Sequence, residues 1–431
     1  MAAKILLVNP PIYDFSAYDF WLKPYGMLSV AGFLRNQAEF KLFDYLDRQH
    51  PFVAEQKQLQ SDRWSRGRFY CEKVPSPPCL AEIPRYFRRF GLPREYFLRF
   101  LSEQPPCDHV FIQTTMTYWY PAVRETIEDI RRIWPKAKVI LGGNYVTICS
   151  KHAETSGADF LVKAANLKPL WEYLHIEPDL TEPPLWEVYK NLNVGILRLT
   201  DGCPFNCTYC SVPNVYGRFK ARTLQHSLAE LELLVKQGVK NIAFYDDALL
   251  FKAEEVLIPF LEQVIRCNIK ADFHTPNALN ARFVTPQLAK LMVRVGFKTF
   301  YLGFESISLQ WQQRTGSKVS SDELAQAVKS LVAAGVEPTS ITAYQILGHP
   351  DTDTQQLEAS MRYANSLGIR VMLADFAPIQ GTPDGERCRE WVNMDEPLFH
   401  NKTVFPIILL GFNEVNRLKS LQQRFNCSLA R

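Results

Sequence analysis

From Val194 onward, the sequence repeats one pattern about six times, an apolar stretch followed by an amphipathic one. The apolar stretches are 194–199, 241–245, 271–274, 299–303, 340–346 and 370–376. The intervening stretches have helical spacing, and several end at a glycine, such as Gly238 or Gly296, as helices often do. Six strand–helix units predict parallel strands inside a layer of helices, and they fit a partial (β/α)6 TIM-type barrel.

The first part of the chain shows the same alternation in a looser form. Its apolar stretches are 5–9, 40–43, 110–113, 139–141 and 160–162, and stretches 26–37 and 121–134 have helical spacing. This pattern predicts an α/β fold with a Rossmann-like doubly wound sheet, which binds ligands at the carboxyl ends of its strands.

Three cysteines, Cys203, Cys207 and Cys210, lie on one loop directly after the first apolar stretch of the second part. Thiolates at this density are ligands for iron–sulfur clusters or zinc. A structural zinc ion needs four protein ligands, whereas three thiolates leave one iron of a [4Fe–4S] cluster open for a small molecule. The alternative is a zinc site with a distant fourth ligand, for which His226 is the nearest downstream histidine.

Composition narrows the class of protein. A chain of 431 residues is long enough for two domains. The other cysteines are scattered without a disulfide framework, no apolar run is long enough to span a membrane, and no signal peptide is evident, so we expect a cytoplasmic protein. The net charge of +4 does not call for a nucleic-acid partner.

An insertion at 46–107 is rich in arginine and aromatic residues, as in 83–90 and 96–100. Such residues can stack on nucleic-acid bases. More often they form an amphipathic helix with a solvated basic face, and we favour that interpretation. The insertion could also cap the ligand crevice of the first domain.

The Cys-x3-Cys-x2-Cys loop closely resembles the signature of the radical S-adenosylmethionine (SAM) superfamily. The resemblance implies a [4Fe–4S] cluster held by the three cysteines, with SAM chelated at the open iron. It also implies reductive cleavage of SAM to a 5′-deoxyadenosyl radical, with electrons from a low-potential donor of the flavodoxin or ferredoxin type.

The resemblance also assigns cofactor contacts to the carboxyl ends of the barrel strands. Asp246 and Asp247 follow the second strand, where the family holds the SAM amino group, and the stretch 303–306 resembles the family's Gly-x-Glu-Ser. The cofactor-binding residues implied in this domain are Tyr209, Asp246, Asp247, His274, Asn277, Glu305 and Gln345. A carboxylate at a strand end can instead cap the next helix. For His349 and Asp351 the two interpretations are balanced.

The first domain resembles the cobalamin-binding-like domain that precedes many radical SAM domains. The resemblance rests on Asn9-Pro10-Pro11, on the stretch 141–144 and on the domain order. It implies cobalamin beside Thr115, Gly142 and Gly143, where glycine allows close backbone approach. The Asp-x-His-x-x-Gly motif for an axial histidine is missing, so a Rossmann-like domain without cobalamin is the alternative.

Together these features predict a Rossmann-like domain at 1–165, a linker at 166–193, a radical SAM barrel at 194–383 and an extension at 384–431. The resemblance implies a cobalamin-dependent methyltransferase that acts on an unactivated carbon of a small-molecule or peptide substrate. Two alternatives remain. One is a cobalamin-independent radical SAM enzyme for rearrangement, cyclisation or dehydrogenation, and the other is a zinc-binding or redox-sensing protein without turnover.

Overall fold

The computed structural model describes residues 2–164, 166–316 and 319–429, and it divides the chain into two compact units. The first unit holds the residues up to Asn193, together with Lys236–Gly238 and Asp395–Asn401. The second holds Val194–Val235, Val239–Met394 and the residues from Lys402 onward. The main division therefore falls between Asn193 and Val194, where the barrel was expected to begin.

The stretch 166–193 is part of the first unit rather than a separate linker. The carbonyl oxygen of Pro183, in this stretch, lies very close to Gly32. A Cβ added at Gly32 would be only 2.1 Å from that oxygen. Arg35 forms ion pairs with Glu182 at 2.8 Å and with Glu187 at 3.0 Å. Close backbone contact and paired charges thus hold this stretch against the helix that precedes Arg35. The predicted extension also differs, since its residues 395–401 belong to the first unit.

The first unit is built on a five-stranded parallel sheet with the order β3-β1-β6-β7-β8. The strands are β1 (Ala3–Asn9), β3 (Ala38–Asp44), β6 (His109–Thr114), β7 (Lys138–Gly143) and β8 (Phe160–Val162). Its helices are α1 (Tyr25–Gly32), α4 (Tyr120–Ile133), α5 (Asn144–Ile148), α6 (Ser150–Ala153) and α7 (Lys168–Leu174). The predicted doubly wound fold is confirmed, and its strand order reverses between β1 and β6.

The insertion forms a second, smaller sheet. Strand β2 (Ile12–Asp14) pairs antiparallel with β5 (Arg88–Phe90), which also pairs with β4 (Cys71–Lys73). The expected amphipathic helix is present as α3 (Arg94–Glu103), whereas the end of the stretch 83–90 is a strand. Arg89 is buried and ion-paired with Glu125 of α4 at 2.9 Å. This part of the basic character therefore serves internal packing rather than a partner.

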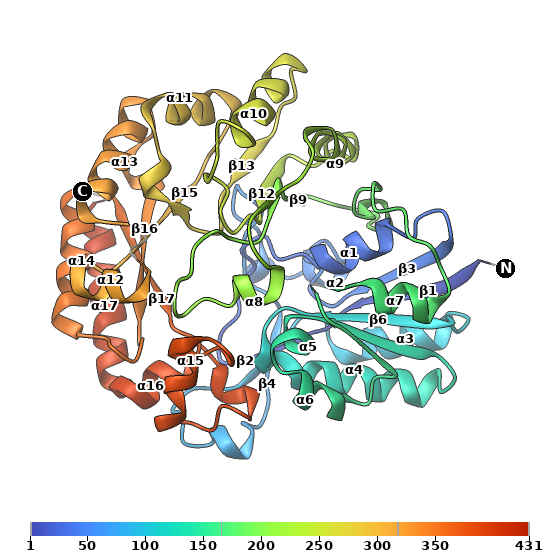
Figure 1. The fold of residues 1–431 in the computed structure, drawn as a ribbon. Coiled ribbons are helices and arrows are strands. Elements are labelled where there is room, and N and C mark those ends of the chain that lie inside the picture. Colours follow the sequence, from blue (N-terminus) through green and yellow to red (C-terminus); the bar gives the residue numbers. More distant parts are fainter. Residues whose placement is uncertain (1, 165, 317–318, 430–431) are drawn as a thin grey trace. The chain divides into compact units, whose positions relative to one another are not determined.

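The second unit is an arc of parallel strands in two sheets, β13-β12-β9 and β14-β15-β16-β17, as expected for a partial barrel. The strands are β9 (Val194–Leu197), β12 (Asn241–Phe244), β13 (Asp272–His274), β14 (Leu279–Asn280), β15 (Phe300–Glu305), β16 (Ile341–Leu347) and β17 (Arg370–Asp375). Helices cover the outside of the arc (Figure 1): α9 (Leu224–Lys236), α10 (Leu257–Arg266), α11 (Pro286–Val295), α13 (Ser321–Ala333) and α14 (Thr354–Ser366).

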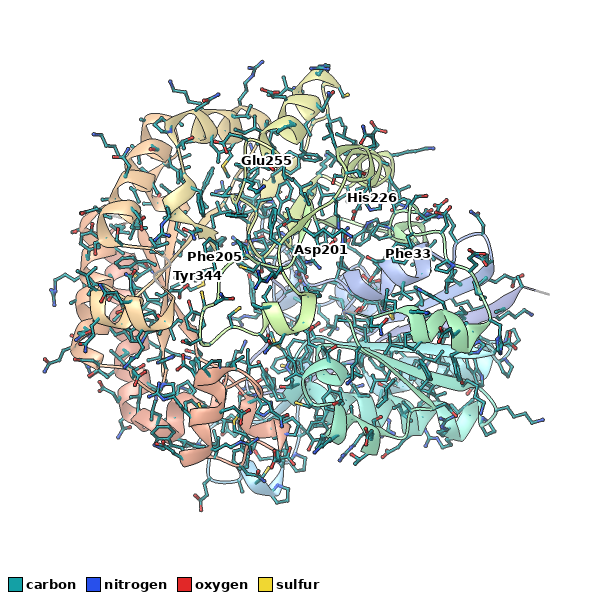
Figure 2. All side chains as sticks on the ribbon, viewed as in Figure 1. Phe33, Asp201, Phe205, His226, Glu255 and Tyr344 are labelled. Atoms are coloured by element: carbon teal, nitrogen blue, oxygen red, sulfur yellow. The ribbon has the colours of Figure 1, made fainter. Side chains whose placement is uncertain are left out.

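Side chains alternate between the two faces of this arc. Tyr301 and Tyr344 stack on each other with ring centroids 5.4 Å apart, and Figure 2 shows Tyr344 and Phe205 on the inner side. On the outer side, Phe304 packs against Tyr363 of α14. Because strand side chains alternate with a period of two, this parity decides which polar residues reach the interior.

The C-terminal helices are α15 (Pro383–Arg387), α16 (Val404–Leu410) and α17 (Phe412–Ser428). The side-chain amide of Asn426 in α17 bonds to both the N–H and the carbonyl of Val371, each at 2.9 Å. Gln422 accepts a hydrogen bond from the N–H of Leu373 at 2.9 Å. These amides substitute for a neighbouring strand along β17 and protect its edge. Among the described residues, no helix combines the length and apolar character needed to cross a membrane.

Candidate metal and cofactor sites

The three cysteines lie on a loop that is closed at its base. Strand β10 (Thr200–Asp201) pairs antiparallel with β11 (Lys220–Ala221), which brings the two ends of the loop together. Arg222 clamps Asp201 with two hydrogen bonds, at 3.0 and 3.1 Å. Gly202 has a φ of +70°, and a Cβ there would lie 2.5 Å from the carbonyl oxygen of Gly217. Glycine is therefore required where the loop leaves β10.

Cys203, Cys207 and Cys210 are half-buried and form no disulfide. The loop after α12 (Leu309–Thr315) lies against one of them, because a Cβ on Gly316 would be 3.2 Å from the Cα of Cys207 and 3.5 Å from its sulfur. Partial exposure leaves room for a bound group, and three soft donors on one loop suit iron–sulfur ligation. The residues present therefore fit a cluster with one iron open.

Tyr209 lies between the second and third cysteines and is fixed by aromatic neighbours. Its ring stacks on Trp311 with centroids 6.0 Å apart and meets the edge of His349 at 6.3 Å. Burial, followed by the charges of Glu305 and the nearby cysteines, raises the pKa of Tyr209 well above its usual value. The hydroxyl therefore stays protonated near neutral pH.

Asp246 follows β12 and uses one carboxylate oxygen for the fold. Its Oδ1 accepts hydrogen bonds from the N–H of Leu199 at 2.9 Å and from the N–H and hydroxyl of Thr200 at 2.6 and 2.7 Å. Its Oδ2 is buried and has no hydrogen-bond partner among the described residues. Burial raises the pKa of Asp246 to about 6. The carboxyl group thus supports the chain through one of its two oxygens.

Asp247 and Asn277 lie beside Asp246. Asp247 lies 3.5 Å from the guanidinium of Arg198, and burial raises its pKa to about 6 despite that charge. The amide of Asn277 donates to the carbonyl of Asp246 at 3.3 Å. The ends of the second and third long strands therefore bring Asp246, Asp247 and Asn277 together.

His274 and Gln345 are engaged by their neighbours. The two ring nitrogens of His274 lie 3.1 Å from Asn241 and 3.3 Å from Thr299, in a fully buried position. Gln345 is also fully buried, and its amide donates to the carbonyl of Ser360 in α14 at 2.9 Å. These hydrogen bonds tie both side chains to the fold, while Oε1 of Gln345 is buried without a hydrogen-bond partner among the described residues.

Glu305 ends β15 in an unusual backbone conformation. Its φ is +61°, and the register of β15 against β16 shifts between Gly303 and Glu305. A left-handed glutamate costs about 1–3 kcal/mol, and such strain clusters at functional sites. Glu305 also lines a pocket with Ser306, Trp311, Ile346, His349, Asp351, Thr352, Asp353, Gln356 and Leu357.

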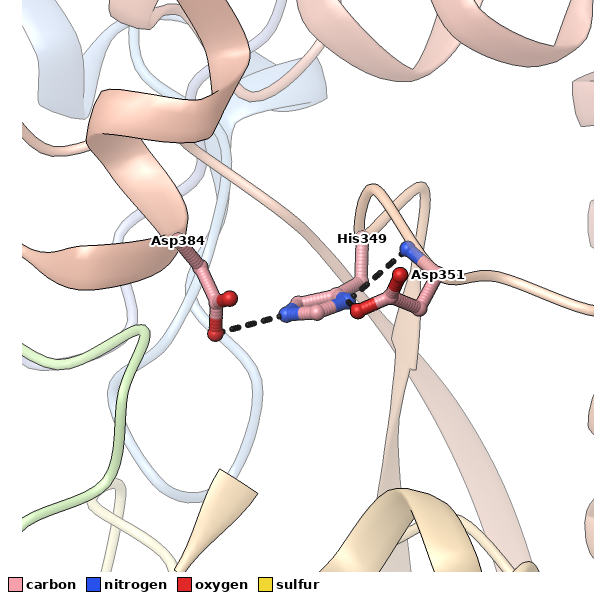
Figure 3. Close-up of side chains that lie close together, drawn as sticks. All are labelled: His349, Asp351 and Asp384. Atoms are coloured by element: carbon pink, nitrogen blue, oxygen red, sulfur yellow. Dashed lines mark hydrogen bonds and ion pairs between the residues drawn. The ribbon is translucent and has the colours of Figure 1, made fainter. Parts of the chain in front are cut away.

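His349, at the end of β16, forms a polar cluster with Asp351 and Asp384 (Figure 3). Its Nε2 lies 2.9 Å from Asp384, and its Nδ1 accepts from the N–H of Asp351 at 3.1 Å. One ligand atom from each of the three residues lies within 4.8 Å of the others, a spacing that a metal ion could use. However, Asp351 is ion-paired with Arg314 at 2.6 Å and with Arg387 at 2.7 Å. The arginines already neutralise this carboxylate, so we interpret the cluster as structural.

Asp384 was not among the residues singled out from the sequence. It follows the Gly381-Thr382-Pro383 turn, which is the only sequence signal near it. Burial alone would raise the pKa of its carboxyl group, but hydrogen bonds from His349 and Thr208 hold that pKa at about 2. The carboxylate is therefore charged near neutral pH.

A pocket in the first unit lies where the strand order reverses. It is lined by residues at the ends of β1 and β6 and by nearby loops: Asn9, Pro10, Pro11, Ile12, Leu22, Lys23, Leu46, Gln113, Thr114, Thr115 and Trp119. Ligands of doubly wound sheets bind at this point. The predicted Thr115 is in the lining, and Gly142 and Gly143 end the adjacent β7.

Gly143 has a reason of its own to be glycine. Its φ is +100°, and a Cβ would approach the carbonyl oxygen of Thr114 to 2.4 Å. At Gly142, by contrast, an added Cβ would make only ordinary contacts, at 3.7 Å or more. Strand packing therefore explains Gly143, whereas the packing around Gly142 would accept a small side chain.

The comparison with protein families identifies the second unit. The model described as the radical SAM superfamily matches residues 197–364, which contain the cysteine loop and the strands from β12 to β16. This part of the chain is a radical SAM domain.

Curated relatives carry names of methyl-transferring proteins. The chain is 26% identical over 191 residues to an uncharacterized methyltransferase, PH0819, of Pyrococcus horikoshii, covering 44% of this chain and 40% of that one. It is 26% identical over 240 residues to the bacteriochlorophyllide d C-12(1)-methyltransferase of Chlorobaculum tepidum, covering 53% and 50%. The chain thus spans half or less of the length of these relatives.

Among solved structures, the radical SAM methyltransferase TsrM from Kitasatospora setae, with cobalamin and a [4Fe–4S] cluster bound, matches with a TM-score of 0.68 and 15% identity. The match covers 98% of this chain and 91% of TsrM. The cobalamin-dependent radical enzyme OxsB matches with a TM-score of 0.57 and 13% identity, covering 98% and 61%. The fold is therefore the one shared with TsrM and OxsB, a doubly wound α/β unit followed in the chain by a partial barrel.

Proposed function

We propose that the chain is a radical SAM enzyme whose Cys203, Cys207 and Cys210 hold a [4Fe–4S] cluster. The observation that carries the proposal is the set of three half-buried cysteines, none in a disulfide, on one closed loop within a radical SAM domain. With three protein ligands, one iron keeps a position for the amino and carboxylate groups of SAM. The alternative, a zinc-binding protein without turnover, would require a fourth protein ligand at the loop.

When bound, the cluster supplies an electron that cleaves SAM into methionine and a 5′-deoxyadenosyl radical, and cobalamin supplies a methyl carrier. The free Oδ2 of Asp246 and the carboxylate of Asp247 are acceptors suited to the SAM ammonium group. Tyr209 presents a rigid ring beside the cysteines, and Glu305 and Ser306 line the adjacent pocket. We assign these residues to SAM binding, with Asn277 orienting Asp246 through its backbone carbonyl.

For the first unit we propose cobalamin binding and, for the whole chain, methylation of an unactivated carbon. The pocket at the point of strand reversal supports this, with Thr115 in its lining and Gly142 nearby. The fold shared with TsrM and OxsB and the relatives named methyltransferase favour the same assignment. We propose a small-molecule or peptide substrate and an electron donor of the flavodoxin or ferredoxin type.

The test is anaerobic reconstitution of the full chain with iron and sulfide, followed by SAM and dithionite. We expect about four irons per chain and 5′-deoxyadenosine that depends on the reductant. A second sample, incubated with hydroxocobalamin and desalted, should retain about one cobalt per chain. Iron and 5′-deoxyadenosine without cobalt would favour the cobalamin-independent alternative. A colourless protein that takes up zinc and no iron would overturn the proposal.

A further inference from the structure

The cysteine loop is held from outside by the residues that end the barrel. Thr208, between the second and third cysteines, donates its hydroxyl hydrogen bond to Oδ2 of Asp384, and its carbonyl accepts from the N–H of Asp384 at 3.1 Å. After the third cysteine, Asn214 in α8 (Val212–Tyr216) donates to the carbonyl of Gly381 at 3.2 Å. The turn at 381–384 therefore contacts the loop on both sides of Cys210.

Asp384 is oriented in turn by His349. The N–H of Asp351 donates to Nδ1 of His349, which leaves Nε2 as the protonated nitrogen that donates to Oδ2 of Asp384. Arg387 binds the other oxygen of Asp384 at 3.1 Å. Oδ2 thus accepts from His349 and Thr208 together, and both of these donors are tied to the cysteine loop or to the end of β16.

The same histidine meets the loop through its ring. His349 contacts Trp311 with centroids 5.3 Å apart, and both rings touch Tyr209. Thr208 and Tyr209 are therefore each fixed by a buried partner, one through hydrogen bonds and the other through aromatic packing. Because these two residues connect Cys207 to Cys210, their fixation sets the direction of both thiols.

We propose that Asp384 and His349 are positioning residues that hold the cysteine loop in its cluster-binding conformation through Thr208 and Tyr209. The inference rests on the proposed function, since it assigns the loop to a cluster. Residues that orient metal ligands from behind typically change metal affinity by about 10- to 100-fold when they are removed. The expected consequence is a cluster that is bound less tightly and responds differently to SAM.

The sharpest variant is Thr208→Val, which removes one hydroxyl and keeps the side-chain shape. Thr208→Ser restores the donor, and Asp384→Asn replaces one acceptor oxygen with a donor nitrogen. Arg389→Gln is the matched control, because Arg389 is exposed and lies shortly after the turn at 381–384. Each full-length protein is reconstituted and challenged with an iron chelator, and its reduced cluster is examined by electron paramagnetic resonance with and without SAM.

We expect Thr208→Val and Asp384→Asn to lose iron about 10-fold more readily than wild type and to show an altered SAM-induced change in the spectrum. Thr208→Ser and Arg389→Gln should behave as wild type. If Thr208→Val matches wild type in both measurements while wild type binds iron and cleaves SAM, this inference fails and the proposed function stands. If wild type takes up no iron, both fail.

Discussion

Two aspartates at the ends of parallel strands, one in each unit, show how differently the units use the same chemical group. Asp44 ends β3 and is buried, with Oδ1 accepting from Asn9 at 2.7 Å and Oδ2 accepting from Tyr189 at 2.6 Å. Lys23 lies 3.9 Å from the same carboxylate. Asp246 follows β12 and is equally buried, yet its Oδ2 has no partner among the described residues.

Both oxygens of Asp44 are bonded within the fold, whereas Asp246, which we propose as a SAM contact, has one oxygen without a partner among the described residues. A buried oxygen without a partner costs about 1–3 kcal/mol, so the chain retains it only where something else offsets the cost. In the first unit, both oxygens of Asp44 serve internal hydrogen bonds, and a ligand would have to bind elsewhere in the pocket. In the second unit, the carboxylate with the unpartnered oxygen is bonded through its other oxygen to Thr200, three residues before Cys203.

The largest effect should come from the cysteine loop itself. Cys207→Ala leaves two thiolates, too few to retain the cluster, and we expect loss of bound iron and of reductant-dependent 5′-deoxyadenosine. Cys267→Ala, at an exposed cysteine beyond α10, is the control. Iron analysis and chromatography of 5′-deoxyadenosine measure the two losses, and far-ultraviolet circular dichroism checks that the variant is folded. Retention of a full complement of iron by Cys207→Ala would contradict the assigned ligands.

The next largest effect should be on the stability of the first unit. Asp44→Ala leaves the buried Asn9 amide, the Tyr189 hydroxyl and the Lys23 ammonium without their acceptor, and we expect a loss of about 3–5 kcal/mol in the free energy of unfolding. Glu128→Ala, on the exposed surface of α4, should change it by less than about 0.5 kcal/mol. Urea unfolding measures both. Equal stability of the two variants would show that Asp44 is not needed for the fold.

A smaller loss of stability should follow from replacing glycines with alanine, and two such positions separate the effect of crowding from that of backbone strain. Gly143→Ala combines a φ of +100° with a clash at the Thr114 carbonyl, whereas Gly217→Ala has a φ of +75° and nothing within 4 Å. We expect a cost of about 1 kcal/mol at Gly217 and a cost of roughly 2–4 kcal/mol at Gly143. Thermal unfolding of the full chain provides the comparison. Similar melting temperatures would show that the strand ends at Gly143 move apart easily.

The smallest effect depends on pH and concerns Asp246. Burial raises its pKa from the ordinary 3.8 to about 6 in the folded chain, so between these pH values the folded state holds a proton that the unfolded state has released. The stability from this group is complete below pH about 4 and is lost as the pH rises through about 6. Asp246→Asn cannot ionise, so its stability relative to wild type should increase between these values.

Urea unfolding at several pH values from about 4 to 7 measures this difference. Asp322→Asn, at an exposed carboxylate in the first turn of α13, controls for the loss of one negative charge. A difference between Asp246→Asn and wild type that does not vary with pH would mean that burial does not hold the proton on Asp246.

The strands and helices could be predicted because their apolar spacing is local. Helix α11 begins and ends where its proline and glycine signals place it, at Pro286 and before Gly296. The faces of the strands could not be predicted, since a period of two gives alternation without saying which set points inward. Gln345 was therefore expected at a cofactor, whereas its neighbour Tyr344 lies on the inner side.

Contacts between residues that lie far apart in the sequence could not be predicted either. Asp384 binds Thr208 across a separation of 176 residues, and nothing near either residue in the sequence signals the pair. The end of the stretch 83–90 became β5 because it pairs with β2, whose residues lie far away in the sequence. The cysteine loop could be predicted as a metal-binding segment because its three cysteines are spaced by four and three residues within one short stretch of sequence.

The central claim is that three cysteines leave one iron open to SAM. The most direct test is electron paramagnetic resonance of the reduced, fully loaded cluster with SAM whose carboxylate carries oxygen-17. Coordination of that carboxylate to iron predicts a broader signal than with unlabelled SAM. Identical line widths at saturating SAM would contradict the claim, because they would place the SAM carboxylate away from the cluster.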